Sequence, residues 1–373
     1  MNFSFWETDS WFSNIDYCII GSGITGLNCA LRLKESEPKA KVLILEKGML
    51  PEGASTKNAG FACFGSISEI LDDLKTHSRA EVVKLVEKRR EGLELLRNNL
   101  GDETIDYQQH KGYELFTEAD KDLYEECLER IPEVNALLKP VFSEDVFAVA
   151  ENHFGFKQIQ PKLIVNNFEG QIDTGKMMTA LVRKALGKGI QILNGVKVTS
   201  FKQKDSSVEI VTDKFNLESG KLIIATNGFA SRLGIDEVKP ARAQVLVTKP
   251  IENIPFNGTF HLDKGYYYFR NIGNRVLFGG GRNLDFEAEE TDETGFTDVI
   301  QNKLKELLET CILPETDFEI QQSWSGIMGV GEQKQPIVKE LSKNVYCGVR
   351  LGGMGIAIGS LVGKELAELA LRS

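Results

Sequence analysis

Residues 21–26 read GSGITG, and this stretch decides the fold of the 373-residue chain. A short apolar run at residues 16–20 precedes it, and a segment with helical character, residues 24–33, follows it. A second apolar run, residues 41–45, ends at the acidic residue Glu46. Strand, glycine turn, helix, strand and acid in this order are the fingerprint of a dinucleotide-binding fold.

The glycines of the motif have separate roles. Gly21 permits the tight turn, Gly23 lets the backbone approach a pyrophosphate, and Gly26 lets the helix pack close to the strand. The phosphates are expected at the N-terminus of the helix, whose free N–H groups favour negative charge. Glu46 is expected to accept hydrogen bonds from the adenosine ribose, and its charge disfavours a 2′-phosphate. The motif alone does not distinguish NAD from FAD.

Composition excludes several classes of protein. The chain has 44 basic and 54 acidic residues, a formal net charge of −10, and lacks a long basic run, so no nucleic-acid partner is expected. No apolar stretch approaches the roughly 18 residues of a transmembrane segment, and residues 1–14 do not resemble a signal peptide. Six scattered cysteines without a CxxC pair indicate neither a metal site nor a disulfide framework. We therefore expect a cytoplasmic protein.

The rest of the chain predicts a second, mainly β domain. A helical pattern at residues 173–186 leads into alternating stretches at residues 191–201 and 208–211, which we interpret as strands beside the nucleotide fold. A hairpin is expected with arms at residues 265–269 and 275–278, on either side of a turn rich in asparagine and glycine.

We expect an α/β fold, α+β overall, in which a Rossmann-like FAD- or NAD-binding domain and a mainly β-sheet substrate domain share the chain discontinuously. The end of the chain returns to the first pattern, with a strand at residues 345–348, a glycine-rich loop and a helix over residues 355–371. The nucleotide domain is predicted to contain residues 1–105, 169–235 and 325–373, and the substrate domain residues 106–168 and 236–324.

Further motifs narrow the choice of cofactor. They are GASTKNAGF at residues 53–61, Asp173, IIATNGFAS at residues 223–231 and GVRLGGMG at residues 348–355. Together with GSGITG they resemble the D-amino-acid oxidase superfamily, which includes glycine, sarcosine and γ-glutamylputrescine oxidases. The resemblance covers nearly the whole chain and implies FAD. It implies FAD contacts from Gly21, Ser22, Gly23, Ile24, Thr25, Gly26, Glu46, Lys47, Ser55, Thr56, Asn58, Ala59, Gly60, Val198, Ala225, Thr226, Asn227, Gly228, Gly326, Gly352, Gly353, Met354, Gly355 and Ile356.

The same resemblance implies that the strand GYYYFRN, residues 265–271, presents a tyrosine to the substrate. Period-two geometry puts Tyr266, Tyr268 and Arg270 on one face of this strand and the intervening aromatic residues on the other. We assign Tyr266 to the substrate site.

An arginine is expected beside the substrate, because the guanidinium fork matches a carboxylate. Arg350, next to the glycine-rich loop, is the first choice, followed by Arg270 and Arg242. For any one of these arginines, a structural or surface ion pair is an equally good interpretation.

Three departures from the family pattern affect function. Leu277 stands where the sarcosine-oxidase type carries a lysine that promotes reaction with oxygen, so oxidase behaviour is in doubt. The segment SGIMGVGEQ, residues 325–333, lacks the cysteine that attaches flavin in that type, so FAD should be noncovalent. Leu351 and Met354 occupy the final glycine loop, where amino-acid oxidases often have histidine or tyrosine. The identity of the substrate cannot be transferred from the family.

The resemblance implies oxidation of a small amine or amino acid by hydride transfer from the carbon bearing the amine to flavin N5, giving an imine that hydrolyses. Oxygen or another acceptor then takes the electrons. The four histidines lie outside the flavin motifs, and we assign none of them a catalytic role. One alternative is an FAD-dependent dehydrogenase of a 2-hydroxy acid, which a histidine in the pocket would favour. A non-catalytic FAD-binding sensor or assembly subunit is the other.

Overall fold

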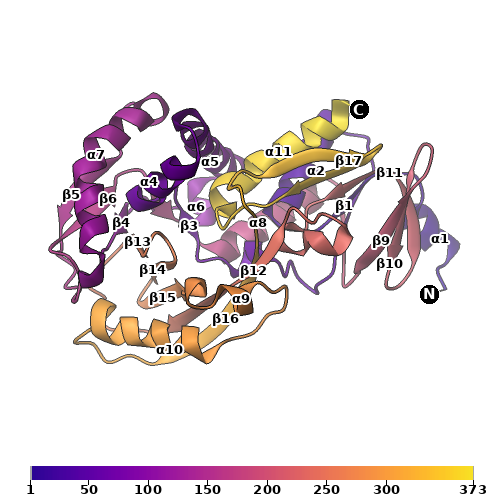
Figure 1. Ribbon diagram of the computed structural model, residues 1–373. Coiled ribbons are helices and arrows are strands. Elements are labelled where there is room, and N and C mark those ends of the chain that lie inside the picture. Colours follow the sequence, from indigo (N-terminus) through magenta and orange to yellow (C-terminus); the bar gives the residue numbers. More distant parts are fainter. Residues whose placement is uncertain (1, 373) are drawn as a thin grey trace.

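The computed structural model describes residues 2–372, and its first large sheet carries the dinucleotide motif (Figure 1). The strand order is β17-β18-β11-β1-β2-β8, with β10 paired to β11 and β9 paired to β10. Neighbours from β18 to β8 are parallel, whereas β17, β10 and β9 pair antiparallel. The strands are β1 (Ile15–Ile20), β2 (Val42–Glu46), β8 (Gln191–Asn194), β9 (Val198–Gln203), β10 (Val208–Thr212), β11 (Asn216–Ile224), β17 (Ile337–Ser342) and β18 (Val345–Val349).

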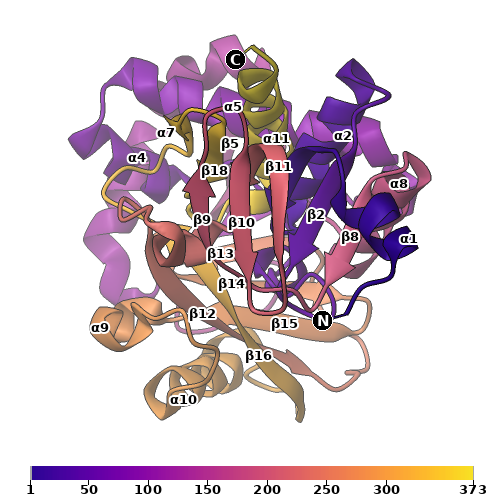
Figure 2. The ribbon, with the colours of Figure 1, turned by 90° about the vertical axis from the view of Figure 1, so that its right-hand side faces the viewer.

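Four long helices accompany this sheet: α2 (Ile24–Ser36), α5 (Arg79–Leu100), α8 (Thr174–Gly187) and α11 (Gly355–Arg372). Helix α11 packs against both α2 and α5, so the two ends of the chain share one core, and Figure 1 shows α11 in yellow beside α2. Gly363 is required at the crossing, because a Cβ there would lie 2.6 Å from the carbonyl oxygen of Thr25 on α2. Figure 2 shows β9, β10 and β11 side by side at the front of the sheet.

The second sheet has the strand order β16-β12-β15-β14-β13-β4-β6-β5, in which only the β13–β4 pair is parallel within the described chain. Ile300 and Leu304 of helix α10 (Asp298–Leu307) pack with Phe260 and Phe269 of the sheet in one apolar core. The strands are β4 (Gly112–Glu114), β5 (Phe147–Glu151), β6 (Lys162–Asn166), β12 (Lys239–Thr248), β13 (Thr259–Leu262), β14 (Tyr267–Ile272), β15 (Arg275–Gly280) and β16 (Ile320–Val330).

A small third sheet and six further α-helices complete the strands and α-helices of the described part of the chain. Strands β3 (Phe61–Ala62) and β7 (Gly170–Gln171) form a two-stranded sheet. The remaining α-helices are α1 (Phe5–Glu7), α3 (Ala54–Lys57), α4 (Ile67–Thr76), α6 (Asp102–Ile105), α7 (Lys121–Phe142) and α9 (Phe286–Glu289). Among residues 2–372, no helix is both long and apolar enough to cross a lipid bilayer.

The structure confirms the predicted mixed α/β class, with two differences in detail. Residues 191–201, predicted as one strand, form two, because Gly195 adopts a φ of +70° and turns the chain between β8 and β9. Strand β16 runs without interruption through residue 324, where a domain boundary was predicted, because it pairs with β12 along its whole length. We retain the five-segment division as a proposal, with its last boundary moved beyond Val330.

Candidate FAD and substrate site

One cavity of about 410 Å³ extends from the GSGITG motif to strands of the second sheet. Its wall includes the C-terminal ends of β1 and β2, the N-terminus of α2, and the loop before α11. At the other end it is walled by residues of β3, α4, β13 and β14. One cavity therefore joins the glycine turn to a pocket whose wall belongs partly to the second sheet.

The dinucleotide end is organised by Glu46. One carboxylate oxygen, Oε2, accepts hydrogen bonds from the backbone N–H of Ser22 at 3.0 Å and from its hydroxyl at 2.7 Å. The other, Oε1, accepts the N–H of Gly48 at 3.0 Å. Glu46 is 5% exposed and lines the cavity, so its buried charge is stabilised by fixed donors and its position at the end of β2 is held.

The wall of this end fits a dinucleotide. A Cβ on Gly21 would lie 2.8 Å from the carbonyl oxygen of Ala225, and a Cβ on Gly23 would lie 2.9 Å from Oγ of Ser55, so side chains are excluded from the turn. The hydroxyls of Thr25 and Thr226 are buried without a hydrogen-bond partner among the described residues, and both side chains belong to the cavity wall. The N-cap of helix α2 is Gly23, which has no side chain, and the N–H of Ile24 donates to Oγ of Ser55 at 2.9 Å, so Ser55 stands beside the helix N-terminus where a phosphate would bind.

Most of the predicted FAD-contacting residues lie in this wall. These are Gly21, Gly23, Ile24, Thr25, Glu46, Lys47, Ser55, Asn58, Ala59, Val198, Ala225, Thr226, Asn227, Gly326, Gly352, Gly353, Met354, Gly355 and Ile356. The others do not reach the cavity surface, and are Ser22, Gly26, Thr56, Gly60 and Gly228. Gly60 instead lies against the Ile172 carbonyl, and Gly228 against the Met328 carbonyl.

The predicted alternation of the GYYYFRN strand is confirmed. Tyr266 and Tyr268 line the cavity, whereas Tyr267 and Phe269 belong to the apolar core of the second sheet. Phe61 stands edge-on to Tyr268, with ring centroids 5.7 Å apart. Burial raises the pKa of Tyr268 to about 12, so this phenol is neutral over the physiological range.

The structure does not bring Arg270 or Arg350 to the cavity. The buried guanidinium of Arg270 donates to the carbonyl oxygens of Ala59 and Ile172, and burial lowers its pKa to about 10. Arg350 turns outward and donates from Nε to the carbonyl of Gln335 at 2.9 Å. The two residues predicted to hold a carboxylate are therefore occupied by backbone oxygens.

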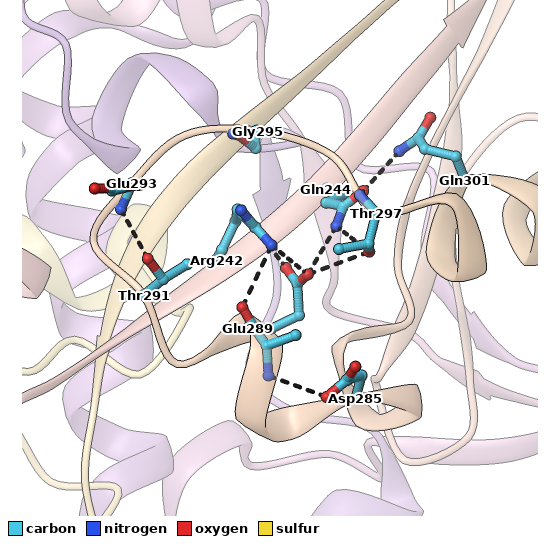
Figure 3. Close-up of polar contacts among 11 residues, drawn as sticks. Arg242, Gln244, Asp285, Glu289, Thr291, Glu293, Gly295, Thr297 and Gln301 are labelled. Atoms are coloured by element: carbon cyan, nitrogen blue, oxygen red, sulfur yellow. Dashed lines mark hydrogen bonds and ion pairs between the residues drawn. The ribbon is translucent and has the colours of Figure 1, made fainter.

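Arg242 is also occupied, as Figure 3 shows. It lies 2.7 Å from the carboxylate of Glu289, which is 1% exposed and also accepts from Gln244. This network ties β12 to the segment around α9. The structural ion pair is thus the correct interpretation of Arg242.

A different arginine faces the pocket. Arg282 lines the cavity, and its guanidinium lies 5.4 Å from the centre of the Tyr266 ring and 5.0 Å from that of Phe286. Within residues 2–372, Arg282 forms neither an ion pair nor a side-chain hydrogen bond. By contrast, Lys264 lies 3.5 Å from Asp72, and Lys334 is paired with Asp73.

The expectation that no histidine belongs to the site is wrong, because His261 lines the cavity. It is 6% exposed, lies on β13 opposite Tyr268, and stacks edge-on against Phe61 at 5.2 Å. The alternation of the TFHL strand carries the signal that was missed, since the neighbours of His261, Phe260 and Leu262, both point into the apolar core.

Cys63 is a second unanticipated wall residue. Its side chain is buried, and its Sγ lies 3.9 Å from Sδ of Met354. Burial raises the pKa of this thiol well above its usual range, so it is protonated. Leu277, in contrast, is 2% exposed and packs against Ala59 and Val245 rather than lining the cavity.

Comparison with solved structures shows the same fold in several enzymes of amine and amino-acid oxidation. L-Proline dehydrogenase of P. horikoshii superposes with a TM-score of 0.74 at 17% identity, covering 96% of this chain and 93% of the other. Glycine oxidase of Geobacillus kaustophilus gives a TM-score of 0.74 at 19% identity, covering 96% and 95%.

Sequence relatives point in the same direction. The chain is 24% identical to the probable oxidoreductase OrdL of Haemophilus influenzae and 26% identical to the γ-glutamylputrescine oxidoreductase of Escherichia coli, with 95% of this chain and 83% of each relative covered. The family model described as FAD dependent oxidoreductase matches residues 16–369. With that match along nearly the whole chain, the protein belongs to the D-amino-acid oxidase (DAO) family of FAD-dependent oxidoreductases.

Proposed function

We propose that the protein uses FAD to oxidise a small amine or amino acid at the carbon that bears nitrogen, acting on a CH–NH or CH–NH2 group. The observation that carries the proposal is the continuity of the cavity, from the dinucleotide turn to a pocket with an aromatic wall and one free guanidinium, Arg282. When bound, FAD would supply the hydride acceptor for this oxidation.

The residues of the pocket have distinct roles in this proposal. Arg282 binds the substrate carboxylate, since it has no acidic partner of its own within the described chain. The aromatic wall, made of Phe61, Tyr266 and Tyr268, excludes water and positions the reacting carbon. Within this wall, Tyr266 remains the tyrosine that we assign to substrate contact. The arginines first expected in this role, Arg270 and Arg350, contribute to the fold.

Relatives support a nitrogen-bearing substrate. The names of the γ-glutamylputrescine oxidoreductase, the glycine oxidase and the L-proline dehydrogenase each refer to an amine or an amino acid. The presence of His261 in the cavity wall supports a second candidate substrate class, the 2-hydroxy acids. Oxidation of an alcohol requires a base to take the hydroxyl proton, and a histidine can act as that base.

Anaerobic mixing of the purified holoprotein with a panel of amines, amino acids and 2-hydroxy acids tests the proposal. We expect loss of the absorbance of oxidised flavin with at least one amine or amino acid. Reduction by hydroxy acids alone would establish the second candidate, and reduction by none would leave an FAD-binding sensor or assembly subunit. Oxygen consumption measured with the active compound then separates an oxidase from a dehydrogenase.

We also propose noncovalent FAD and a cytoplasmic location. Residues 325–333 contain no cysteine, and the thiol of Cys63 is held protonated by burial, which opposes nucleophilic attachment. All six cysteines are free, which is compatible with a reducing compartment. Acid precipitation should release intact FAD into the supernatant, and flavin in the pellet would contradict noncovalent binding.

A further inference from the structure

His261 has two unequal ring nitrogens. Nε2 is closed to solvent, makes no hydrogen bond among the described residues, and lies 3.4 Å from Oε2 of Glu169 as an ion-pair contact. Nδ1 also makes no hydrogen bond among the described residues, but unlike Nε2 it is not fully buried, and since His261 lines the cavity we infer that Nδ1 is the nitrogen on the cavity side. A proton on Nε2 directed at Glu169 leaves the lone pair of the neutral ring on Nδ1.

Glu169 is fixed in the orientation that this arrangement needs. Its other oxygen, Oε1, accepts the backbone N–H of Phe64 at 3.0 Å and the side-chain amide of Asn166 at 3.3 Å. The carboxylate is 1% exposed. With Oε1 held by these donors, Oε2 is left for the imidazole, which is the relation between an orienting acid and a histidine base.

The groups around His261 favour its cationic form. Burial alone lowers the pKa of the imidazole, but Glu169, Glu69 on α4 and Glu114 on β4 raise it, and the net change is upward. Two further titratable neighbours are neutral: the thiol of Cys63 and the phenol of Tyr268, which pairs with His261 across the sheet. A proton that reaches Nδ1 is therefore stabilised by these carboxylates, of which Glu69 also lines the cavity.

We propose that His261, oriented by Glu169, is the base that takes a proton from the ammonium group of the substrate in the pocket. The proposal rests on the proposed amine oxidation, because at neutral pH most amines arrive protonated and hold no lone pair to assist loss of hydride. An N–H bond of the ammonium breaks, its electron pair stays on nitrogen, and the proton binds Nδ1. FAD, when bound, would accept the hydride released as the C–H bond breaks, and the lone pair left on nitrogen would form the C=N bond of the imine.

The test uses holoenzyme variants His261→Asn and Glu169→Gln, with His153→Asn as a control on an exposed histidine. The rate of flavin reduction at saturating amine is measured anaerobically from pH 6.5 to 10.5. In His261→Asn we expect a loss of about 100-fold at pH 7. The rate should then rise about tenfold per pH unit and approach the parental rate near the pKa of the substrate, where the amine arrives neutral. Glu169→Gln should give a smaller loss with the same recovery, because its amide favours the Nδ1–H tautomer.

A second readout does not depend on turnover. Nitrogen NMR of ¹⁵N-histidine-labelled oxidised holoenzyme, with the His261 signals assigned from His261→Asn, should show a protonated Nε2 and an unprotonated Nδ1 in the neutral ring. An unprotonated Nε2 would overturn the assignment even if a variant fails to fold. A parental rate and pH profile in His261→Asn, or a uniform loss without recovery at high pH, would overturn it while leaving amine oxidation intact. If no amine reduces the parent enzyme at any pH, both the proposed function and the base are wrong.

Discussion

The two ends of the cavity differ in which parts of the chain form their walls. At the dinucleotide end the wall centres on one local unit, β1, the glycine turn and α2, where Gly21 and Gly23 present backbone to the cavity and Glu46 holds the N–H groups of Ser22 and Gly48. Residues of other segments, among them Val198 and Ala225, complete this end. At the substrate end the wall consists of side chains from strands and helices far apart in the chain, including Phe61, His261 and Arg282. The first end is defined by main-chain geometry, and the second by the register of distant strands.

This difference predicts how each end responds to mutation. A backbone site has no room for an added atom, because nothing in it can rotate away. A side-chain site loses one contact at a time, because its neighbours stay in place. A substitution that crowds the glycine turn should therefore cost most of the affinity for FAD. In the second sheet, by contrast, one substitution should change only stability, another only the pH dependence of stability, and a third only the affinity for substrate.

The largest effect is expected for Gly26→Ala. A Cβ at residue 26 would lie 2.0 Å from the carbonyl oxygen of Gly21, a backbone atom that cannot move without opening the turn. We expect at least a 100-fold loss of FAD affinity, about 2.7 kcal/mol or more. The ratio of flavin to protein absorbance after gel filtration, followed by titration with FAD, measures it.

Gly53→Ala is the control, because residue 53 lines the cavity and a Cβ there meets no atom within 4 Å. It should keep its FAD. Equal FAD affinity in the two variants would show that the turn can move to accept a Cβ at residue 26. The proposed contrast between the two ends of the cavity would then be wrong.

A loss of similar size, in stability rather than in cofactor affinity, is expected for Arg242→Met, in the second sheet but outside the cavity. Removing the guanidinium leaves the buried carboxylate of Glu289 without its cation, and breaking such a pair costs about 3 kcal/mol or more of the free energy of unfolding. FAD content and substrate affinity should not change. Chemical denaturation measures the loss, and Lys239→Met serves as control, because the neighbouring Lys239–Glu290 pair is exposed and worth less than about 1 kcal/mol. Equal losses in the two variants would contradict a special role for the buried pair.

A pH-dependent effect of about 2–3 kcal/mol is expected for Glu114→Gln. Burial raises the pKa of Glu114 to about 7, against the hydrogen bonds from Ser68 that lower it. The folded state thus holds a proton that the unfolded chain releases near pH 4.5. As pH rises from 5 to 8, the free energy of unfolding of the wild type should fall relative to that of the variant, because ionisation of the buried carboxylate opposes folding. Urea denaturation at the two pH values measures the difference, and a constant gap between the proteins would exclude an ionising Glu114.

The contrast between the two ends also explains what could be read from the sequence. Strands β1 and β2 and helix α2 were predicted within a few residues, because the motif, its helix and Glu46 lie within one short segment. The roles of the arginines could not be predicted. Arg270 donates to Ala59 and Ile172, which are distant in sequence and offer only carbonyl oxygens, groups that every residue has. The alternation of the TFHL strand placed His261 opposite its apolar neighbours, but that this face lines the cavity beside Tyr268 depends on pairing with β14, which the sequence did not show.

The smallest effect, and the one that tests the side-chain-built end most directly, is expected for Arg282→Met. Methionine keeps the apolar stem against Tyr266 and Phe286 but removes the charge, so only the interaction with a carboxylate is lost. Because Arg282 is partly exposed, we expect about a tenfold weaker affinity for a substrate that carries a carboxylate, close to 1.4 kcal/mol. The amine counterpart without the carboxylate should bind the parent and the variant equally. Arg282→Lys should recover part of the loss, since a point charge replaces the fork. Anaerobic flavin reduction as a function of substrate concentration separates affinity from the limiting rate, and only affinity should change if Arg282 anchors a group away from the reacting carbon. An equal loss for the substrates with and without a carboxylate would mean that Arg282 shapes the aromatic wall, and the carboxylate anchor would then have to be sought at Lys264 or Lys334, which already face Asp72 and Asp73.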